Sequence, residues 1–432
     1  MKRGWKPALC WALYDWANTV YALVVLAGFY PIFYAEYWAR GLSPADQTFW
    51  YGLTVSAASI TVGVLAPFLG SFAELSGKRK KGLRLCMIIG TTACFSLVLV
   101  APGQFWVASL IYVVGTVCYF SGNLFYDSLL GVVAPPGKQH LVSGLGFSLG
   151  YSASTLVLLI SLVLLGNHEA WGIESPATVI RGLFVLAAAW WAVFSLPLLL
   201  GVHDPAAADS TASMPRARDG FKRTWSTLKD ILRRPLVRWF LIAYLFYIDG
   251  LNTVITMSIN YAKVLGFGSG ELLIALLVVQ VVGVPSAITF GWLGQRIGPL
   301  RMIQAGLVLY LGVTAYGAVL DVNPRELFGF EISDMYILAG LIGLAQGGVQ
   351  ALSRSYFNSI IPADKTTAYF GFYSMIGKSA AIIGPLLMGV VALITDDPRY
   401  GIAAVSVLFL IGMIFLHLAA RTARSARDNV TQ

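Results

Sequence analysis

The chain has 432 residues, of which 57% are hydrophobic and 12% are charged, whereas soluble globular domains carry roughly 25% charged residues. Apolar runs of about 20 residues, long enough to cross a bilayer, alternate with short charged connections. The net charge of +9 does not indicate a nucleic-acid partner, because the basic residues lie in the connections and form no patch on a soluble domain. The sequence therefore predicts an all-α, polytopic membrane protein.

Apolar runs interrupted by charge, proline or glycine predict twelve transmembrane helices in two sets of six. The start of the chain, with Lys2, Arg3 and Lys6 before an apolar run, resembles a signal peptide, but the run contains Asp15 and no small-residue cleavage site follows it. We therefore take it as the first helix. The predicted helices are 9–38, 48–73, 83–101, 104–133, 141–166 and 179–201 in the first set, and 237–262, 270–293, 300–320, 335–361, 367–394 and 400–420 in the second.

A polar segment, 202–236, separates the two sets. Its first half is rich in Ala, Ser and Asp, which is typical of a flexible linker. Its second half mixes apolar residues with Lys and Arg, as amphipathic helices on a membrane surface do. We expect this segment to divide an N-terminal bundle, 1–201, from a C-terminal bundle, 237–420, which a tail, 421–432, follows.

The distribution of Lys and Arg predicts the orientation, because short cytoplasmic loops carry an excess of both. With the N-terminus inside, the inner segments hold 24 of the 30 basic residues. We therefore expect both termini to be cytoplasmic, in a bacterial inner (plasma) membrane, or in a vacuolar membrane if the protein is eukaryotic. The outer connections hold only Arg40, Arg181, Lys263, Arg325 and Arg399.

The second half of the chain repeats the first. Both halves begin on the same side of the membrane, so the repeat is parallel, as in transporters built from two like halves. Duplication alone could also preserve these motifs for packing. The matches are D-x-x-N-T-V at 15–20 and 249–254, the connections that start at Gly70 and Gly291, and G-x5-G at 144–150 and 371–377, with offsets of 234, 221 and 227 positions.

The connection after the second helix resembles the loop signature of the major facilitator superfamily, with Glu74 in place of the family's Asp. The resemblance implies that the first, fourth, seventh and tenth helices line a central cavity. An acid at a helix end beside a basic run can form a latch of charge and helix dipole, and glycines let helices approach closely. Because the second copy has Gln295 for the acid, we expect a weaker latch there. The signature residues are Gly70, Glu74, Gly77, Lys78 and Arg79 in the first copy, and Gly291, Gln295 and Arg296 in the second.

A more specific resemblance rests on WALYDWAN at 11–18, PIFY at 31–34 and QALSRS at 350–355. These segments resemble the vacuole-effluxer branch of the superfamily, which includes fungal autophagy-related vacuolar amino-acid effluxers and many bacterial proteins. The resemblance implies a secondary transporter that exports amino acids or similar solutes, although substrate is the least transferable property of a shared fold. The short chain, without long tails, favours a bacterial member.

Four charged residues lie within predicted helices: Asp15, Asp249, Arg354 and Lys378. A charge at the bilayer centre costs about 3 kcal/mol on insertion scales and usually has a function. Asp15 or Asp249 could take up and release a proton while Arg354 and Lys378 hold a carboxylate. The alternative is fixed ion pairing, of Asp15 with Arg354 or of Asp249 with Lys378, without any transport chemistry.

Amide side chains complete the predicted solute or coupling site. Gln346, Gln350 and Arg354 follow one another at i, i+4 and i+8 and share one helix face. Such groups either line a wet cavity or bridge neighbouring helices, and we favour the cavity for the clustered set. The further candidates are Asn18, Asn123 and Asn252.

Other functional classes lack their signatures. The sequence has no phosphate-binding G-x-x-x-x-G-K-[ST] motif for a nucleotide-driven pump, no nucleophile with a base for an enzyme and no repeated pore loop for a channel. We expect no cofactor and no metal, a monomer, and a small solute, lipid and protons as partners. A facilitator or importer of sugars, peptides or lipid-like solutes, or a non-transporting sensor or scaffold, remains open.

Overall fold

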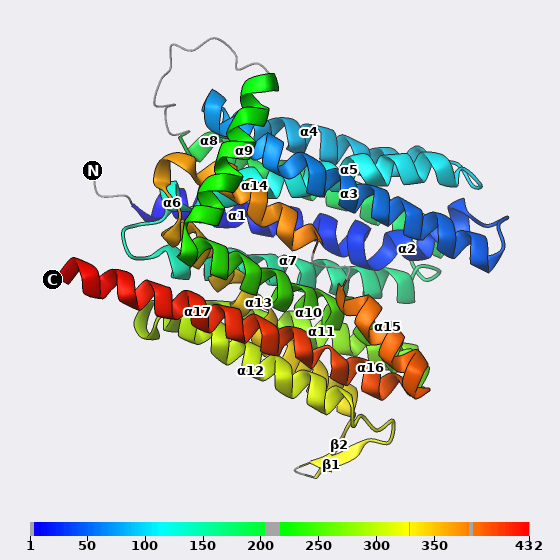
Figure 1. The fold of residues 1–432 in the computed structure, drawn as a ribbon. Helices are drawn as coiled ribbons and strands as arrows, with labels where there is room; N and C mark the ends of the chain where they lie inside the picture. The colour runs from blue at the N-terminus through cyan, green and yellow to red at the C-terminus, as the bar shows by residue number, and fades with distance from the viewer. Residues whose placement is uncertain (1–3, 204–216, 328, 380–382, 432) are drawn as a thin grey trace. The chain divides into compact units, whose positions relative to one another are not determined.

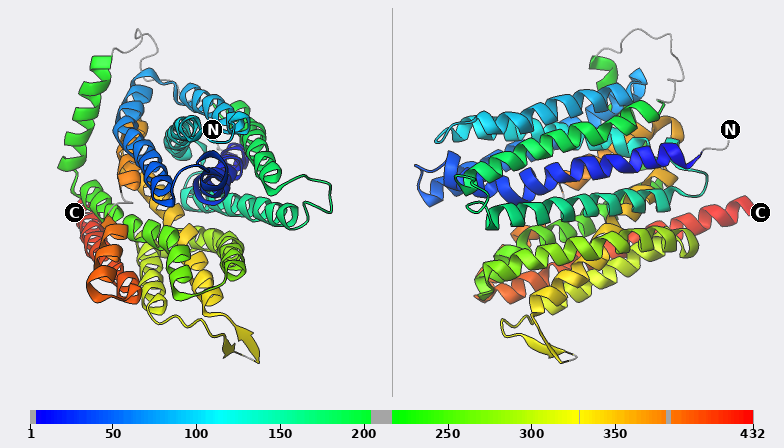
Figure 2. Two further views of the ribbon diagram at one scale, coloured as in Figure 1. Left: turned by 90° about the vertical axis from the view of Figure 1, so that its right-hand side faces the viewer. Right: turned by 180° about the vertical axis from the view of Figure 1, so that it is seen from behind.

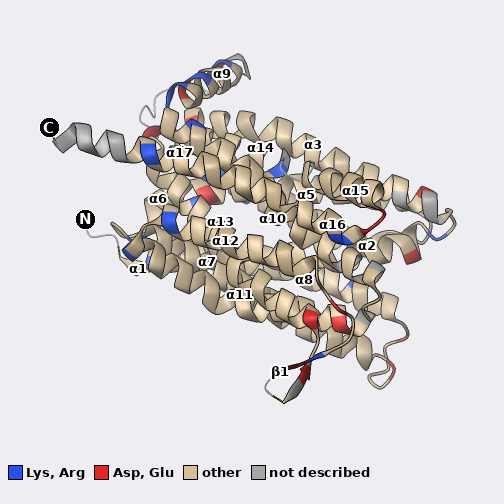
Figure 3. Ribbon diagram, turned by 60° about the horizontal axis from the view of Figure 1, so that its bottom comes forward, with Lys and Arg blue, Asp and Glu red and all other residues tan. Residues whose placement is uncertain are grey.

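The computed structural model describes residues 4–203, 217–327, 329–379 and 383–431, and nearly all of them are helical (Figure 1). Within these residues, eleven helical runs are long and apolar enough to cross a membrane, and α12 (Pro299–Gly317) occupies the ninth predicted position. The helices carry few charged residues along their length (Figure 3). The predicted twelve-helix fold class is confirmed, while linker residues 204–216 and the basic pair Lys2 and Arg3 lie outside the described residues.

The first six predicted helices are all present, with ends that differ by a few residues from the prediction. Their elements are α1 (Trp5–Tyr21), α2 (Phe29–Phe33), α3 (Pro44–Ser76), α4 (Arg79–Ser96), α5 (Phe105–Ser128), α6 (Leu130–Val133), α7 (Gln139–Gly166) and α8 (Pro176–Gly201).

Two stretches of π-helix interrupt the first transmembrane run, at Ala22–Gly28 and Tyr34–Trp38. The run also contains Pro31, which has no N–H to donate and crowds the preceding turn. Wider π-helical turns accommodate such a residue and occur often at functional sites. The first helix is therefore one continuous run, Trp5–Trp38, with local irregularities in its second half.

Residues typical of helix ends set both boundaries of the long helix α3. Ser43 caps its start by accepting a hydrogen bond from the backbone N–H of Asp46, and Pro44 occupies the first turn. Gly77 ends it with a left-handed φ of 63°, a conformation that favours glycine after a helix. Gly77 of the loop signature therefore stops the helix, which differs from the close approach expected of the signature glycines.

The second six predicted helices are also present. The described residues of the eleventh form two helices on either side of 380–382, and the twelfth is divided at Val405. Their elements are α10 (Pro235–Leu265), α11 (Ser269–Ile297), α12 (Pro299–Gly317), α13 (Asp334–Ile360), α14 (Thr366–Ser379), α15 (Ile383–Thr395), α16 (Pro398–Ala404) and α17 (Ser406–Thr431).

A small antiparallel hairpin, β1 (Arg325–Leu327) and β2 (Phe330–Ile332), joins α12 to α13 (Figure 2). It is anchored on the carboxylate of Asp334, which is fully buried. This carboxylate accepts hydrogen bonds from Arg325 Nε at 2.7 Å, Tyr316 Oη at 2.8 Å and the backbone N–H of Asp321 at 3.0 Å. The predicted outer loop around Arg325 is therefore ordered by one buried acid.

The described chain divides into two compact units that do not coincide with the two halves of the sequence. Unit 1 comprises Met1–Pro136, Leu149–Thr224 and Asp364–Met375, and unit 2 comprises Gly137–Ser148, Trp225–Ala363 and Ile376–Gln432. Each unit thus contains a short helical segment that belongs by sequence to the other half. These two segments are the first turns of α14 and of α7.

The second part of the predicted linker forms a helix, α9 (Ala217–Arg233). Within unit 1, the ring of Phe221 stacks on Phe68 of α3 at a centroid distance of 5.9 Å. Thr224 also donates a hydrogen bond to Ser71 Oγ at 2.9 Å. One face of α9 therefore packs on α3, and its contact with a membrane surface stays a prediction.

Candidate functional site

In unit 1, α3 crosses the first turns of α14 at two glycines. A Cβ placed on Gly70 would lie 2.5 Å from the carbonyl oxygen of Thr367 and 3.1 Å from the Cα of Gly371. A Cβ on Gly371 would lie 2.7 Å from the carbonyl oxygen of Ala66. Only hydrogen fits at these positions, because both neighbours are backbone. The predicted role of Gly70 in close approach is thereby given a specific partner, α14.

The carboxylate of Glu74 lies at the start of α14. Its Oε2 accepts hydrogen bonds from the backbone N–H groups of Thr367 at 2.8 Å and Ala368 at 3.3 Å, and its Oε1 pairs with Arg79 at 3.4 Å. The Glu74 side chain is 6% exposed. An acid at a helix N-terminus satisfies N–H groups that have no intrahelical partner and stabilises the helix dipole. Glu74 therefore joins an ion pair to a helix N-terminus, and its action as a latch stays a prediction.

Unit 2 contains the equivalent crossing, of α7 on α11. A Cβ on Gly144 would lie 2.5 Å from the carbonyl oxygen of Ala287, and one on Gly291 would lie 2.7 Å from that of His140. The repeat thus places the Gly144–Gly291 pair where unit 1 has Gly371 and Gly70. The side chain of Gln295 stands at the position of Glu74, and its Nε2 has no hydrogen-bond partner in the described part of the chain.

Arg354 of α13 holds the unit 2 crossing from a third helix. Its Nε donates to Ser143 Oγ at 3.0 Å and its NH2 donates to the Ser143 carbonyl at 3.1 Å. The guanidinium also lies over the ring of Phe147, 4.5 Å from its centroid, and the residue is only 4% exposed. The structure thus assigns Arg354 to the start of α7, although the sequence had suggested that it holds a solute carboxylate.

Three neighbouring polar contacts at this crossing were not predicted. His140 Nδ1 lies 2.8 Å from Ser355 Oγ, Asn358 donates to Gln139 at 3.1 Å, and Ser143 Oγ donates to the carbonyl of Ala351 at 2.7 Å. The QALSRS segment contains Ser355, so the motif could have pointed to α13 but not to its partner on α7. Arg296 of the loop signature lies over the ring of Trp292, 4.0 Å from its centroid.

We expect Glu74→Gln to weaken the unit 1 crossing by about 1 to 3 kcal/mol, because it removes the charge that faces the α14 dipole and the buried Arg79. The midpoint of thermal unfolding in detergent measures this loss. Gln295→Glu should instead raise this midpoint, since it places an acid at the equivalent position of the second crossing. Glu169 is exposed, so Glu169→Gln is the matched control. Equal midpoints for Glu74→Gln and Glu169→Gln would contradict the latch.

The interior of unit 1 joins the predicted residues of the first and fourth helices. The Asn18 amide donates to Asn123 Oδ1 at 2.5 Å and is 2% exposed. Trp11 donates to the carbonyl of Tyr126 at 2.8 Å, and the two rings stack at 4.2 Å. Asn18 and Asn123 therefore bridge α1 and α5. Asp15 is half-buried one turn before Asn18.

Asp249 occupies the equivalent position of unit 2 but has a different environment. It is fully buried, and its Oδ2 accepts a hydrogen bond from the backbone N–H of Gly384 at 3.1 Å, at the start of α15. Its Oδ1 has no hydrogen-bond partner in the described part of the chain. The contact that the structure gives to Asp249 is thus the backbone N–H of Gly384, whereas the alternative raised above was an ion pair with Lys378.

The contacts of Gly384 correct one part of the predicted repeat. A Cβ on Gly150 would meet Thr19 Oγ1 and the Asp15 carbonyl, and a Cβ on Gly384 would meet the corresponding atoms of Thr253 and Asp249. Gly384 is therefore the counterpart of Gly150, at an offset of 234. The prediction that Gly377 answers Gly150 is wrong, because Gly377 instead approaches the hydroxyl of Tyr244.

This correction reveals extra residues in the eleventh helix. Gly150 follows Gly144 by six positions, whereas Gly384 follows Gly371 by thirteen. The α14–α15 segment therefore carries seven residues that α7 lacks. Lys378, which is half-buried in the last turn of α14, lies in this stretch. The gap-free match of the two G-x5-G motifs concealed the insertion.

The predicted glutamines lie on α13 and are half-buried. The Gln346 Oε1 is buried without a hydrogen-bond partner in the described residues, and so is the Oε1 of Gln280 on α11. The two helices are in close contact here, since a Cβ on Gly343 would lie 2.8 Å from the carbonyl oxygen of Val279. Gln350 and Asn252 are also half-buried. Gln280 was not predicted, because a single amide in an apolar run has no distinguishing pattern.

The site therefore combines two glycine crossings with a polar interior. In unit 2 the buried side-chain oxygens of Asp249, Gln280 and Gln346 receive no hydrogen bond from the described residues. Such acceptors suit a bound group that brings N–H or O–H donors. Among the described residues no group of His, Cys, Asp and Glu could hold a metal ion.

Comparisons with known proteins bear on the family of this chain. A family model described as "Vacuole effluxer Atg22 like" matches residues 5–429. The uncharacterized MFS-type transporter YxiO of Bacillus subtilis is 36% identical over 419 residues, which cover 96% of this chain and 95% of that protein. Autophagy-related protein 22 of Eremothecium gossypii is 28% identical over 352 residues, which cover 75% of this chain and 67% of that protein.

Likeness to solved structures supports the fold independently. The proton:xylose symporter XylE bound to 6-bromo-6-deoxy-D-glucose has a TM-score of 0.72 at 12% identity, over 95% of this chain and 94% of that chain. By the extent of the family match and of the similarity to YxiO, the chain belongs to the vacuole effluxer family of major facilitator transporters, and it is a transporter rather than an enzyme.

Proposed function

We propose that this transporter exports amino acids or similar zwitterions in exchange for protons, by alternating access, as a monomer with both termini in the cytoplasm of a bacterium. The observation that carries the proposal is the Asp249 carboxylate, buried with one oxygen on the start of α15 and the other without a partner in the described residues. An ammonium group or a proton would complete it, because both supply what this oxygen lacks.

The rest of unit 2 fits the two ends of a zwitterion. The buried Oε1 atoms of Gln280 and Gln346 also lack donors in the described residues, which favours an ammonium group over an anion. Lys378, in the last turn of α14, is the cation that we assign to the carboxylate end. We no longer assign Arg354 to the solute carboxylate, because its guanidinium donates hydrogen bonds to Ser143.

Coupling follows from the cost of burying an ionised carboxylate. When Asp249 has neither proton nor solute, its negative charge disfavours the closed, dry intermediate that alternating access must pass through. When it carries either one, the charge is neutralised and the halves can change access. Solute and proton would therefore be exchanged. Asp15, its counterpart in the first repeat, is half-buried and is the second candidate for this role.

The two glycine crossings would form the gate on the side of the basic connections. The crossing of α3 and α14 has the charged latch of Glu74, and the crossing of α7 and α11 has neutral contacts around Arg354. We therefore assign the main gate to the Glu74 crossing.

Transport by purified protein in proteoliposomes tests the substrate class. We expect a panel of radiolabelled L-amino acids to include at least one that exchanges across the membrane and accumulates against its gradient when a pH difference is imposed. Protein-free liposomes are the control. Exchange of sugars or peptides without any amino acid would overturn the proposal, and exchange of amino acids without response to pH would overturn its proton coupling.

A further inference from the structure

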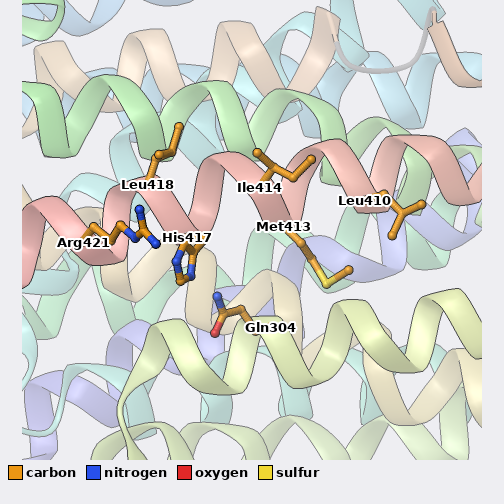
Figure 4. Close-up of a pocket in the computed structure, with 7 residues that line it drawn as sticks. All are labelled: Gln304, Leu410, Met413, Ile414, His417, Leu418 and Arg421. Atoms are coloured by element: carbon orange, nitrogen blue, oxygen red, sulfur yellow. The ribbon is translucent and has the colours of Figure 1, made fainter.

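A groove on unit 2 has the composition of a phospholipid site. It lies between α12 and the stretch of α17 from Leu410 to Arg421 and has a volume of about 610 Å³. Gln304 comes from α12, and the other lining residues come from α17 (Figure 4). These others are Leu410, Met413, Ile414, His417, Leu418 and Arg421.

The lining changes character along the groove. Leu410 and Ile414 are 46% and 61% exposed and give one end an open apolar wall. His417 and Arg421 follow at helical spacing on α17, and Gln304 faces His417 from α12 (Figure 4). The groove is therefore apolar at one end and has a basic, hydrogen-bonding rim at the other.

The length of the groove matches one leaflet of a bilayer. From Leu410 to Arg421 the helix rises roughly 16 Å, at 1.5 Å per residue, and half of a bilayer's hydrocarbon core is about 15 Å. Arg421 lies close to the end of the apolar span Pro398–Ala423, at the level where headgroups begin. An acyl chain beside Ile414 would thus bring its phosphate to Arg421.

We propose that this groove binds an anionic glycerophospholipid, with the acyl chain along α17 and the headgroup phosphate on Arg421, His417 and Gln304. A guanidinium matches a phosphate with paired hydrogen bonds, and the Gln304 amide adds a further donor. Arg301, exposed one turn before Gln304, adds positive charge to the same face. Basic pockets between transmembrane helices favour anionic headgroups in this way.

A second groove supplies a contrast within the same molecule. It lies on unit 1 between α4 and α5, has a volume of about 350 Å³ and is lined by apolar residues with Thr92 and Ser96, without a charged side chain. It could accept an acyl chain but offers nothing that selects an anionic headgroup. Headgroup selectivity should therefore depend on Arg421 and not on the unit 1 groove.

Native mass spectrometry of the full chain, delipidated in detergent and titrated with phosphatidylglycerol or phosphatidylcholine, tests the proposal. We expect preferential binding of phosphatidylglycerol by the wild type. Arg421→Ala should weaken that binding about tenfold, the effect of one lost charge-assisted contact, and Arg421→Lys should restore part of it. Arg84, exposed on α4, provides the control Arg84→Ala, which should bind like the wild type.

Three results would overturn the site. These are equal binding of the two lipids by the wild type, an equal loss in Arg84→Ala and Arg421→Ala, or binding of soluble glycerol phosphate as strong as that of the lipid. Circular dichroism of each variant shows that the helices are intact. Because lipid binding is measured without transport, failure of the amino-acid assay leaves this test unaffected.

Discussion

Replacing Asp249 by Asn should leave the protein folded and still able to exchange solute, but unable to use a pH gradient. The amide introduced by Asp249→Asn retains an oxygen that can accept the hydrogen bond from Gly384, so the contact that anchors the start of α15 is preserved. This amide carries no titratable proton. The variant therefore separates the structural role of this side chain from its proposed role in coupling.

The expected size of this effect follows from the energy of the gradient. One pH unit supplies about 1.4 kcal/mol per proton, which supports an accumulation ratio of about ten for exchange of one proton per solute. In proteoliposomes with an imposed pH difference, the wild type should approach this ratio and Asp249→Asn should stay near unity. Counterflow without a gradient should persist in Asp249→Asn at higher solute concentrations, because the amide oxygen still accepts a hydrogen bond from an ammonium group but no longer carries a charge.

Asp15→Asn is the matched control, because Asp15 has the same place in the first repeat but is only half-buried. Loss of gradient response in Asp15→Asn with a normal response in Asp249→Asn would transfer the coupling role to the first helix. A normal response in both variants would exclude proton coupling through either acid.

Replacing Gly70 by Ala should cause the largest loss of stability among single-methyl substitutions in α3. The new Cβ would lie 2.5 Å from the Thr367 carbonyl and 3.1 Å from the Gly371 Cα, both on the backbone of α14. Neither helix can yield by a side-chain rotation, so α3 and α14 must move apart. Overpacking of this kind costs about 1 to 3 kcal/mol.

The same helix offers a control. Gly52 also belongs to α3, and a Cβ there would meet no atom within 4 Å. Alanine favours a helix over glycine, so Gly52→Ala should unfold at the wild-type temperature or slightly above, whereas Gly70→Ala should unfold several degrees lower. If the two variants unfold together in detergent, the crossing contributes little to stability.

Much of the fold could be predicted from the sequence because the membrane restricts which structures can cross it. A transmembrane helix must satisfy all its backbone hydrogen bonds internally and present an apolar surface, so apolar runs mark nearly every helix. Short polar structure is less predictable. The β1–β2 hairpin has three-residue strands that contain charged residues, and its anchor is the buried Asp334, which the sequence places simply at the start of a helix.

The site was predictable in its residue types but not in their partners. Intramembrane charge indicated Asp249 and Arg354, because buried charges are rare in membranes. Their contacts, Gly384 and Ser143, lie 135 and 211 positions away, and no local pattern encodes such distances. The repeat was the best guide to these partners, since it identified Gly70 and Gly291 as equivalent residues. Matching without gaps, however, could not detect that the eleventh segment has more residues than the fifth.

The seven extra residues of α14–α15 are also notable for their position. They lie between two glycine contacts that the repeat retains. Within unit 1, Gly371 meets α3 as Gly144 meets α11 in unit 2, and within unit 2, Gly384 meets α10 as Gly150 meets α1 in unit 1. One of two duplicated segments thus gained seven residues and a lysine during evolution, while the glycine contact at each of its ends was retained.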